Sequence, residues 1–410
     1  MIHNMQTIRA QFPQLQEKVY GKALVYLDNA ATSLRPVSVA DCWQEMALRY
    51  NANVHRAVHK TASDATLRYE AARKAVAAHI NAASEKEIVF TSGDTAALNL
   101  VARCFGAAFI GEGDEIIVAQ SEHHSNLVPW QMICKERGAV LKCLPVDESG
   151  HLQLELLPQL LTERTKLLCV ADISNVLGLR NPVAKIVRLA HEKGCPVLVD
   201  GAQGIVHGNI DVRALDCDFY TFSGHKVYAA PGTGVLYAKR KWLEAMPPYM
   251  GGGEMIESVA WEGSTYAAPP YRFEAGTPNI AGVPTLVPAL EMARELNSAD
   301  VAAQADAVRD FVLDALTSLP GLRLFGQPAD REEKVPIFSF TVEGAHHEDL
   351  ALLLDKMGIA VRSGQMCAEP LMTRFGVTGM LRASFAPYNT MQEAEYFVAS
   401  MKKAIKMLVG

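Results

Sequence analysis

The stretch that decides the fold is Asp218-Phe219-Tyr220-Thr221-Phe222-Ser223-Gly224-His225-Lys226. Its aromatic and β-branched residues are typical of a buried strand, and the polar, glycine-containing part that follows is typical of a turn. Lys226 is therefore expected just beyond the carboxyl end of a strand. A second apolar run, Pro196-Val197-Leu198-Val199, leads in the same way into Asp200-Gly201-Ala202-Gln203. The sequence thus predicts a lysine and an aspartate at the carboxyl ends of two strands.

This pair of residues meets the requirements of pyridoxal 5'-phosphate. A lysine can hold the aldehyde as a Schiff base, and an aspartate can pair with the pyridinium nitrogen so that the ring accepts electrons. Taken alone, Asp200 would be a turn residue and Lys226 a surface lysine. Because Gln203, Ser223 and His225 stand beside them, the combination favours a cofactor site.

Short β-like runs alternate with helical patterns from about residue 20 to 285. Strands are expected at 87–90, 115–118, 166–170 and 233–237, and helices at 94–105, 127–137 and 183–193. Such alternation predicts an α/β fold with a mainly parallel sheet covered on both faces. Ligands of these sheets bind beyond the carboxyl ends of the strands, which is where Asp200 and Lys226 are expected.

The remaining sequence lacks this alternation. A long helical region is expected over 284–319, then strands at 336–340 and 381–385 and helices at 347–357 and 391–408. These elements fit a smaller α+β domain. We therefore expect a large cofactor-binding domain over 20–285 and a small domain formed by 1–19 and 286–410. The segment 251–271, rich in Gly, Pro, Ser and Tyr, is expected to be a long loop over a site or an irregular connection.

Composition narrows the class of protein. The 410 residues, 49% of them hydrophobic and 20% charged, are typical of a soluble globular protein of two or three domain-sized units. A net charge of −6 provides no basic field for nucleic acid or an anionic membrane. No long apolar span and no signal-peptide layout is recognised. Eight cysteines without a CxxC pair indicate reduced thiols in the cytoplasm.

Two further segments could complete a cofactor site. Thr91-Ser92-Gly93-Asp94-Thr95 joins an expected strand to an expected helix, where free amides attract phosphate. Asp94 could equally be an N-cap with no ligand. His123, in Ser121-Glu122-His123-His124-Ser125-Asn126, follows another strand and could stack on the pyridine ring, although the same residues would also suit a polar turn.

A reactive thiol is expected in Arg362-Ser363-Gly364-Gln365-Met366-Cys367-Ala368-Glu369-Pro370. This polar loop follows an apolar strand, so Cys367 is the cysteine least expected to be buried. A thiolate is the nucleophile, and a neighbouring guanidinium from Arg362 or Arg382 would favour that form. Arg382 could also clamp a substrate carboxylate through two hydrogen bonds. The alternative is an exposed cysteine without a role.

These motifs resemble the cysteine desulfurases of the class V aminotransferase family, in particular the second group of Suf-type enzymes, which is related to selenocysteine lyases. The resemblance runs almost end to end. Besides the motifs above, it rests on Tyr26-Leu27-Asp28-Asn29-Ala30-Ala31-Thr32, Asn53-Val54-His55-Arg56, Ser174-Asn175-Val176-Leu177-Gly178, Gly251-Gly252-Gly253-Glu254-Met255-Ile256 and Phe273-Glu274-Ala275-Gly276-Thr277-Pro278-Asn279.

The resemblance implies a fold-type I, aspartate-aminotransferase-like homodimer with a seven-stranded sheet and with active sites at the subunit interface. Thr277 would reach the cofactor phosphate of the neighbouring subunit, and His55 and Arg56 would lie near the interface. His55 and His59 have helical i,i+4 spacing, but no acidic third ligand accompanies them, so no metal site is expected.

The resemblance also implies the roles of residues in converting L-cysteine to L-alanine. Lys226 would move the α-proton, Asp200 would keep the ring nitrogen protonated, and Cys367 would take the sulfur as a persulfide. The other implied cofactor contacts are Gln203 at the ring hydroxyl, His123 stacked on the ring, and Thr95, Ser223, His225, Thr277 and Asn175. The implied substrate contacts are Arg382, Asn175, Arg362 and His55. The short cysteine loop implies a Suf-type sulfur-acceptor protein and iron–sulfur cluster assembly.

Departures from the family pattern leave alternatives open. Asp94-Thr95-Ala96 stands where relatives usually have Thr-Thr-Glu, and Met366 where many have His. Because a carboxylate would repel phosphate, we expect Asp94 to point away as an N-cap. A selenocysteine lyase acting on L-selenocysteine would share all these residues, whereas an aminotransferase would not need Cys367. A relative that carries the cofactor but only binds a partner is the non-enzyme alternative.

Overall fold

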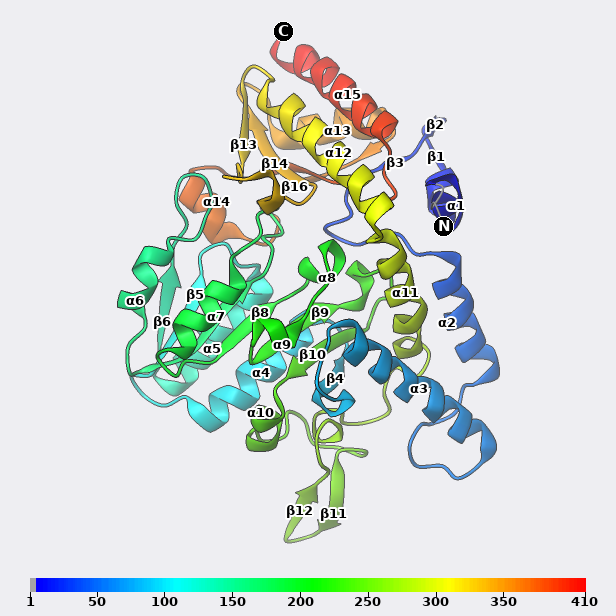
Figure 1. Cartoon of the computed structure of the whole chain (residues 1–410), viewed down its shortest axis with the longest axis vertical. Helices are drawn as coiled ribbons and strands as arrows, with labels where there is room; N and C mark the ends of the chain where they lie inside the picture. The colour runs from blue at the N-terminus through cyan, green and yellow to red at the C-terminus, as the bar shows by residue number, and fades with distance from the viewer. Residues whose placement is uncertain (1–4) are drawn as a thin grey trace.

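The computed structural model describes residues 5–410, and its centre is a seven-stranded sheet (Figure 1). In spatial order the strands are β4 (Ile88–Thr91), β10 (Gly234–Ala238), β9 (Phe219–Ser223), β8 (Val197–Asp200), β7 (Thr165–Ala171), β5 (Glu115–Ala119) and β6 (Val140–Leu144). Of these strands, β10 alone runs in the direction opposite to the other six. The expected α/β fold with a mainly parallel seven-stranded sheet is confirmed.

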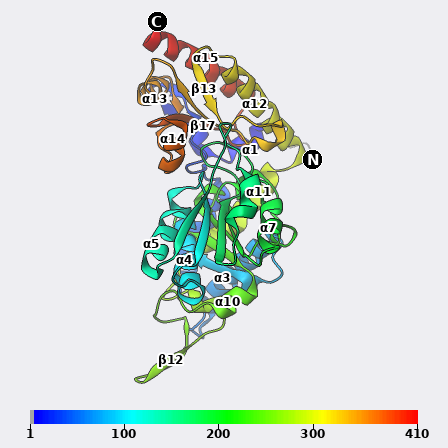
Figure 2. The same cartoon turned by 90° about the vertical axis from the view of Figure 1, so that its left-hand side faces the viewer.

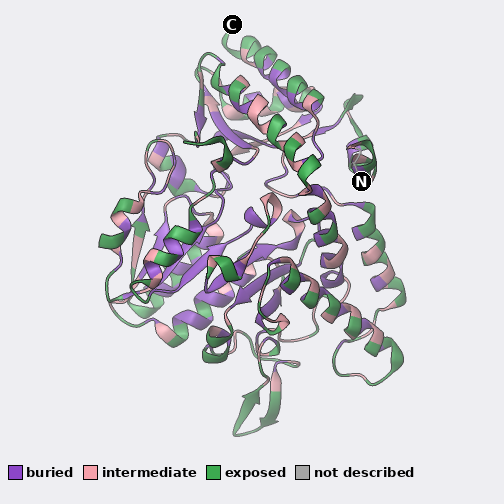
Figure 3. Cartoon of the chain, viewed as in Figure 1, coloured by how far each residue is buried: buried purple, intermediate pink, exposed green. Residues whose placement is uncertain are grey.

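Helices cover both faces of this sheet because alternate residues of each strand point to opposite sides. In β5, Ile116 and Val118 pack with α4 (Asp94–Phe109) and α5 (Val128–Arg137), whereas Ile117 packs in the other core cluster. That second face is covered by α3 (Lys60–His79), α7 (Val183–His191) and α11 (Leu286–Leu296). Strands β5, β7, β8 and β9 are therefore largely buried on both faces, as Figure 3 shows, whereas the edge strand β6 is partly exposed.

A second, antiparallel sheet lies in the C-terminal part. Its order is β13 (Leu322–Phe325), β14 (Ile337–Val342), β17 (Met380–Ser384) and β16 (Arg362–Gly364). It packs with α12 (Ala299–Thr317), α13 (His347–Lys356) and α15 (Met391–Val409) in a separate core cluster. Figure 2 shows these elements stacked beyond one end of the central sheet.

The N-terminal part contributes to this second core. Strand β3 (Val25–Tyr26) pairs with β15 (Ile359–Ala360), and Val25 and Leu27 belong to the C-terminal core cluster. The division into domains at residues 20 and 285 stays a prediction, and residues 1–4 of the expected small domain lie outside the described part of the chain.

The remaining helices and strands are short or peripheral. The helices are α1 (Met5–Ala10), α2 (Val37–Arg49), α6 (Leu157–Leu160), α8 (Gly204–His207), α9 (Val212–Leu215), α10 (Arg240–Ala245) and α14 (Glu369–Phe375). The strands are β1 (Lys18–Val19), β2 (Lys22–Ala23), β11 (Ile256–Ala260) and β12 (Gly263–Tyr266). No helix within residues 5–410 combines the length and apolarity needed to cross a membrane.

Two expectations are wrong in detail. The helical region 284–319 is interrupted after Leu296, where α11 ends, and α12 begins at Ala299. The expected loop 251–271 contains the β11–β12 hairpin, which projects from the end of the molecule opposite to α15 (Figure 1). Every residue of its two strands except Ile256 is exposed. The hairpin is therefore held by hydrogen bonds between its two strands and does not pack on a hydrophobic core.

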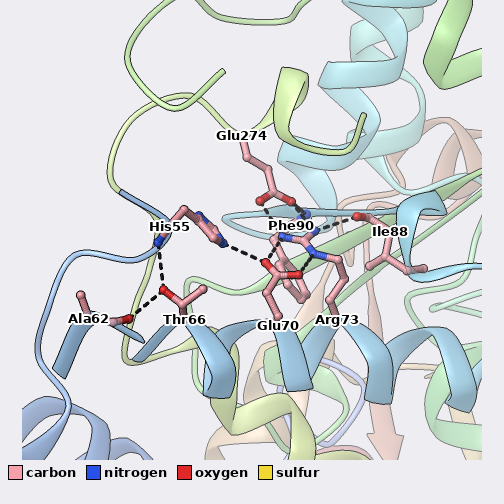
Figure 4. A network of polar contacts seen from close by, with 8 residues as sticks. All are labelled: His55, Ala62, Thr66, Glu70, Arg73, Ile88, Phe90 and Glu274. Atoms are coloured by element: carbon pink, nitrogen blue, oxygen red, sulfur yellow. Dashed lines mark hydrogen bonds and ion pairs between the residues drawn. The ribbon is translucent and has the colours of Figure 1, made fainter. Parts of the chain in front are cut away.

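A buried ion-pair network connects α3 to the sheet edge (Figure 4). The guanidinium of Arg73 donates from Nη1 and Nη2 to Glu274, at 2.7 and 2.9 Å, and from Nε to Glu70 at 2.9 Å. Arg73 also donates to the Ile88 carbonyl of β4, and Glu274 accepts from the Phe90 amide. The side chains of Arg73 and Glu274 are 1% and 7% exposed, so neither charge has water as a substitute partner.

We predict that Glu274→Ala destabilises the fold by about 3 kcal/mol, because it leaves a buried guanidinium without its main partner. The matched control is Glu136→Ala, which removes an exposed ion pair with Arg103 and should cost under about 1 kcal/mol. Denaturant unfolding curves of the two variants measure the difference. Equal losses of stability would contradict this account of the network.

Candidate active site

The site forms where β8 and β9 end side by side. These strands are parallel, with Leu198 opposite Phe219 and Asp200 opposite Thr221. The chain leaves β9 at Ser223 and makes a 3-10 turn over Gly224–Lys226. Lys226 and Asp200 therefore reach the same cavity at the carboxyl edge of the sheet.

The cavity has a volume of about 170 Å³. Of the residues that the sequence singled out, its walls contain Thr95, His123, Asn175, Asp200, Gln203, Ser223, His225, Lys226, Arg362 and Arg382. These side chains come from both sheets and from loops up to 287 positions apart, between Thr95 and Arg382. The structure thus gathers most of the predicted site in one place.

Burial opposes charge on the two central groups. It lowers the pKa of the Lys226 ammonium, although Asp200 and Asp94 favour its charged form. It raises the pKa of the Asp200 carboxyl, against the opposing effect of Lys226. Asp200 accepts a hydrogen bond from the Ala202 amide at 3.0 Å, and Gln203 donates to the Ala30 carbonyl at 2.9 Å. The side chains of Asp200 and Gln203 are therefore both held in place.

The expectation that Asp94 points away as an N-cap is wrong. Gly93 occupies the N-cap of α4, and Asp94 is the first helical residue, buried and lining the cavity. Burial, and then Asp200, raises the pKa of the Asp94 carboxyl well above its usual value. A shift in this direction favours the uncharged carboxyl and so weakens the repulsion that motivated the expectation. Thr95 is exposed and shares a hydrogen bond with the Ser125 hydroxyl at 2.7 Å.

His123 is held as a neutral imidazole. Its Nδ1 accepts a hydrogen bond from the Ser125 amide at 3.0 Å, so the proton of the neutral ring is on Nε2. Burial, followed by the charge of Lys226, lowers the pKa of His123 to about 4. Burial likewise lowers the pKa of His225 to about 4, and its Nδ1 lies 3.2 Å from the Thr32 hydroxyl.

Cationic and amide groups form the wall contributed by the C-terminal sheet. Arg382 is 2% exposed, and it donates from Nη1 to the Asn175 carbonyl at 2.9 Å and from Nη2 to Asp28 at 3.1 Å. Its Nε is buried without a protein partner. Arg362, paired with Arg382 across β16 and β17, lines the same wall. This wall suits a carboxylate ligand.

The cysteine loop lies at the edge of the cavity. The expectation that Cys367 is the least buried cysteine is wrong, because Cys367 is partly buried whereas Cys143 is exposed. Met366 lines the cavity, and both Met366 and Cys367 adopt left-handed backbone conformations, with φ of 53° and 55°. Such strain in non-glycine residues is concentrated at functional sites. The loop is fixed by the His124 amide, which donates to the Cys367 carbonyl at 2.7 Å, and by Asn175, which donates to the Met366 carbonyl at 2.9 Å.

Three predicted site residues are not among those that line the cavity: Cys367, whose neighbour Met366 does line it, and the more distant Thr277 and His55. Thr277 is exposed in the segment after Glu274, and His55 pairs with Glu70 at 2.9 Å in the network of Figure 4. Neither residue lines the cavity of its own chain. Their roles at a subunit interface stay predictions.

Sequence reasoning missed three acidic residues around the site. Asp28 pairs with Arg382, Glu122 accepts from the Ala171 amide, and Asp172 accepts from the Tyr220 hydroxyl at 2.7 Å. Burial raises the pKa of Glu122 to about 8 and that of Asp172 to about 7. The signal available was their position, since Asp172 directly follows β7 and Asp28 and Glu122 come shortly after β3 and β5.

Fold and site define a PLP-dependent enzyme of fold type I. The chain matches the aminotransferase class-V family over residues 25–397, and it belongs to this family. Curated relatives include a probable cysteine desulfurase from Vibrio cholerae serotype O1, 45% identical over 408 residues, and a cysteine desulfurase from Cronobacter sakazakii, 45% identical over 409 residues. Both alignments cover 100% of each chain.

Solved structures agree with this placement. The cysteine desulfurase CsdA from Escherichia coli, in an S-sulfonic acid form, superposes with a TM-score of 0.90 at 42% identity. The apo cysteine desulfurase from Thermococcus onnurineus NA1 superposes with a TM-score of 0.94 at 36% identity. Each comparison covers 100% of both chains.

The residues present fit pyridoxal 5'-phosphate, the cofactor of this class of enzymes. One cavity contains Lys226, whose charge is disfavoured by burial, and the buried carboxyl of Asp200. The N-terminus of α4 and His225 provide hydrogen-bond donors for a phosphate. The buried Oδ1 of Asp94, a residue that lines the cavity, has no hydrogen-bond partner in the protein. When bound, the cofactor supplies an aldehyde and an electron-accepting ring.

We predict that His123 stays neutral down to about pH 4, whereas an unperturbed imidazole titrates near pH 6.5. Between these values the unfolded chain binds the proton and the folded chain does not. The contribution of His123 to stability is therefore complete above about pH 6.5 and is lost as the pH falls toward 4. Nitrogen NMR of histidine-labelled protein should show the Nε2–H form at pH 6, assigned by its disappearance in His123→Gln. A cationic His123 at pH 6 would refute this.

Proposed function

We propose that the protein is a PLP-dependent cysteine desulfurase, which converts L-cysteine to L-alanine and carries the sulfur as a persulfide on Cys367. The observation that carries the proposal is the cavity itself. Lys226 and Asp200 lie at the sheet edge, Arg382 and Arg362 form the C-terminal wall, and the Cys367 loop adjoins that wall.

The C-terminal wall binds the carboxylate of the substrate. Arg382 lines the cavity and is held by Asp28 and by the Asn175 carbonyl, so its guanidinium group is fixed in position at this wall. Arg362 adds a second positive charge on the neighbouring strand. Because the guanidinium groups are already in place, little ordering is needed when the carboxylate binds.

Lys226 and His123 handle protons. Burial lowers the pKa of Lys226. When its amine is not bound to the cofactor, it can therefore accept the α-proton of the substrate and later return a proton to the product. His123 lines the cavity, and its Nδ1 is occupied by the Ser125 amide, which leaves the proton of the neutral ring on Nε2. It is therefore a hydrogen-bond donor rather than a base in the resting site.

Cys367 accepts the sulfur. Its Sγ attacks the substrate sulfur, so that an S–S bond forms while the C–S bond of the substrate breaks. The electron pair of the broken bond stays on the β-carbon, which takes up a proton to become the methyl group of alanine. His124 and Asn175 hold the loop through hydrogen bonds to the backbone carbonyls of Cys367 and Met366. These bonds do not involve the thiol of Cys367.

Partner and assembly belong to the same proposal. The exposed position of Thr277 outside its own cavity supports a homodimer in which it reaches the other site. Transfer of the persulfide to a Suf-type acceptor protein in the cytoplasm, for iron–sulfur cluster assembly, follows from the short loop around Cys367. The large unit over 20–285 would bind the cofactor, and the C-terminal unit would supply the cysteine loop.

We predict that Cys367→Ser abolishes sulfide release from L-cysteine while the visible absorption band of the bound cofactor is retained, because only the sulfur acceptor is removed. The matched control is Cys143→Ser, which alters an exposed cysteine outside the cavity and should leave turnover unchanged. Alanine and sulfide are measured with and without acceptor proteins.

Sulfide release that survives in Cys367→Ser would contradict the assignment of the acceptor thiol. A parallel assay with L-selenocysteine decides the substrate. Selenide release that persists in Cys367→Ser, alongside loss of sulfide release, would favour a selenocysteine lyase.

A further inference from the structure

One turn of the chain presents four consecutive backbone carbonyls to the C-terminal elements. This turn, residues 174–178, carries Asn175 at its start. The carbonyl of Asn175 accepts from Arg382 at 2.9 Å, that of Val176 accepts from the Ser339 hydroxyl at 2.6 Å, and that of Leu177 accepts from Lys334 Nζ. The carbonyl of Gly178 accepts from the Val335 amide at 2.8 Å.

Close packing leaves this turn no other position. Gly178 has a φ of 61°, and a Cβ there would lie 2.5 Å from the Ile337 carbonyl oxygen. Gly326, with a φ of 70°, approaches from the other side, where a Cβ would lie 2.4 Å from the Leu177 carbonyl oxygen. Backbone therefore contacts backbone on both sides of the turn.

Lys334 is the unusual member of this set. It is 1% exposed, and its Nζ donates to the carbonyls of Leu177 and of Gly326, the latter at 2.9 Å. The Phe338 ring centroid lies 5.4 Å from the same atom. Burial lowers the pKa of Lys334 to about 7. A neutral amine has two N–H groups, which matches the two carbonyls, so this side chain can act as a buried hydrogen-bonding tether without a counter-ion.

The turn connects this tether to the substrate wall. Asn175 donates from its side chain to the Met366 carbonyl beside Cys367, and its own carbonyl holds Nη1 of Arg382. A shift of the Leu177 carbonyl would therefore also move the Asn175 carbonyl, which lies two residues earlier in the chain and is the hydrogen-bond partner of Arg382. Lys334 itself does not line the cavity, so its influence is indirect.

We propose that Lys334 and Ser339 are positioning residues for substrate recognition: by holding the carbonyls of Leu177 and Val176 they set the directions in which Arg382 and Asn175 meet the substrate carboxylate. This rests on the proposed function in that it takes Arg382 and Asn175 as the carboxylate site.

The experiment compares two ligands that differ by the carboxylate alone. L-Alanine carries it, and ethylamine is the same amine without it. Binding of each to the cofactor-loaded protein is followed by the change in cofactor absorption. In Lys334→Met the dissociation constant of L-alanine should rise about tenfold, the size expected if a displaced Arg382 loses one hydrogen bond to the carboxylate, while that of ethylamine changes less than about twofold.

Ser339→Ala gives a second, gentler variant, because it deletes only the hydroxyl that donates to Val176. It should raise the L-alanine constant about threefold with the same selectivity, and it keeps the proposal testable if Lys334→Met does not fold. The matched control is Lys402→Met, an exposed lysine on α15, which should change neither constant.

Equal weakening of both ligands in the two variants would show a general packing role and overturn the proposal, as would no weakening of either. The readout needs no sulfur chemistry. A wild-type protein that binds L-alanine but releases no sulfur from L-cysteine would defeat the proposed function, while selective loss in these variants would still support the positioning role.

Discussion

The parallel pairing of β8 with β9 is the constraint on which the site depends. With Asp200 opposite Thr221 in the register, both chains leave the sheet at the same edge, and the turn after Ser223 returns Lys226 toward the carboxyl of Asp200. A shift of one residue would send every side chain of a strand to the other face. The buried residues on both faces of β8 and β9 make such a shift costly, so the core of the sheet fixes the chemistry at its edge.

Charge is divided between two walls of the cavity. Asp200 at the end of β8 and Asp94 at the start of α4 supply the acidic side, and the C-terminal sheet supplies Arg362 and Arg382. Lys226 stands at the acidic side, and burial disfavours charge on it and on the two carboxyls. The site is thus prepared to exchange protons near its acidic side and to bind an anionic group at the other.

Much of the site could be predicted because its residues follow strands along the chain. Asp200 and Lys226 come directly after buried runs, which local pattern reveals. The contacts that the sequence did not reveal depend on tertiary pairing. Asp28 and Arg382 are 354 positions apart, and Asp94 lies buried at the cavity beside Asp200, which comes from a different part of the chain. The β11–β12 hairpin was missed because its exposed strands lack the apolar pattern that identifies buried ones.

The most direct test is to locate the covalent attachment of the cofactor. Borohydride reduction of the cofactor-loaded protein, followed by proteolysis and mass spectrometry, should place the pyridoxyl group on the peptide that contains Lys226, and Lys226→Ala should carry none. Attachment to any other lysine, or a cofactor that is never attached, would contradict the account.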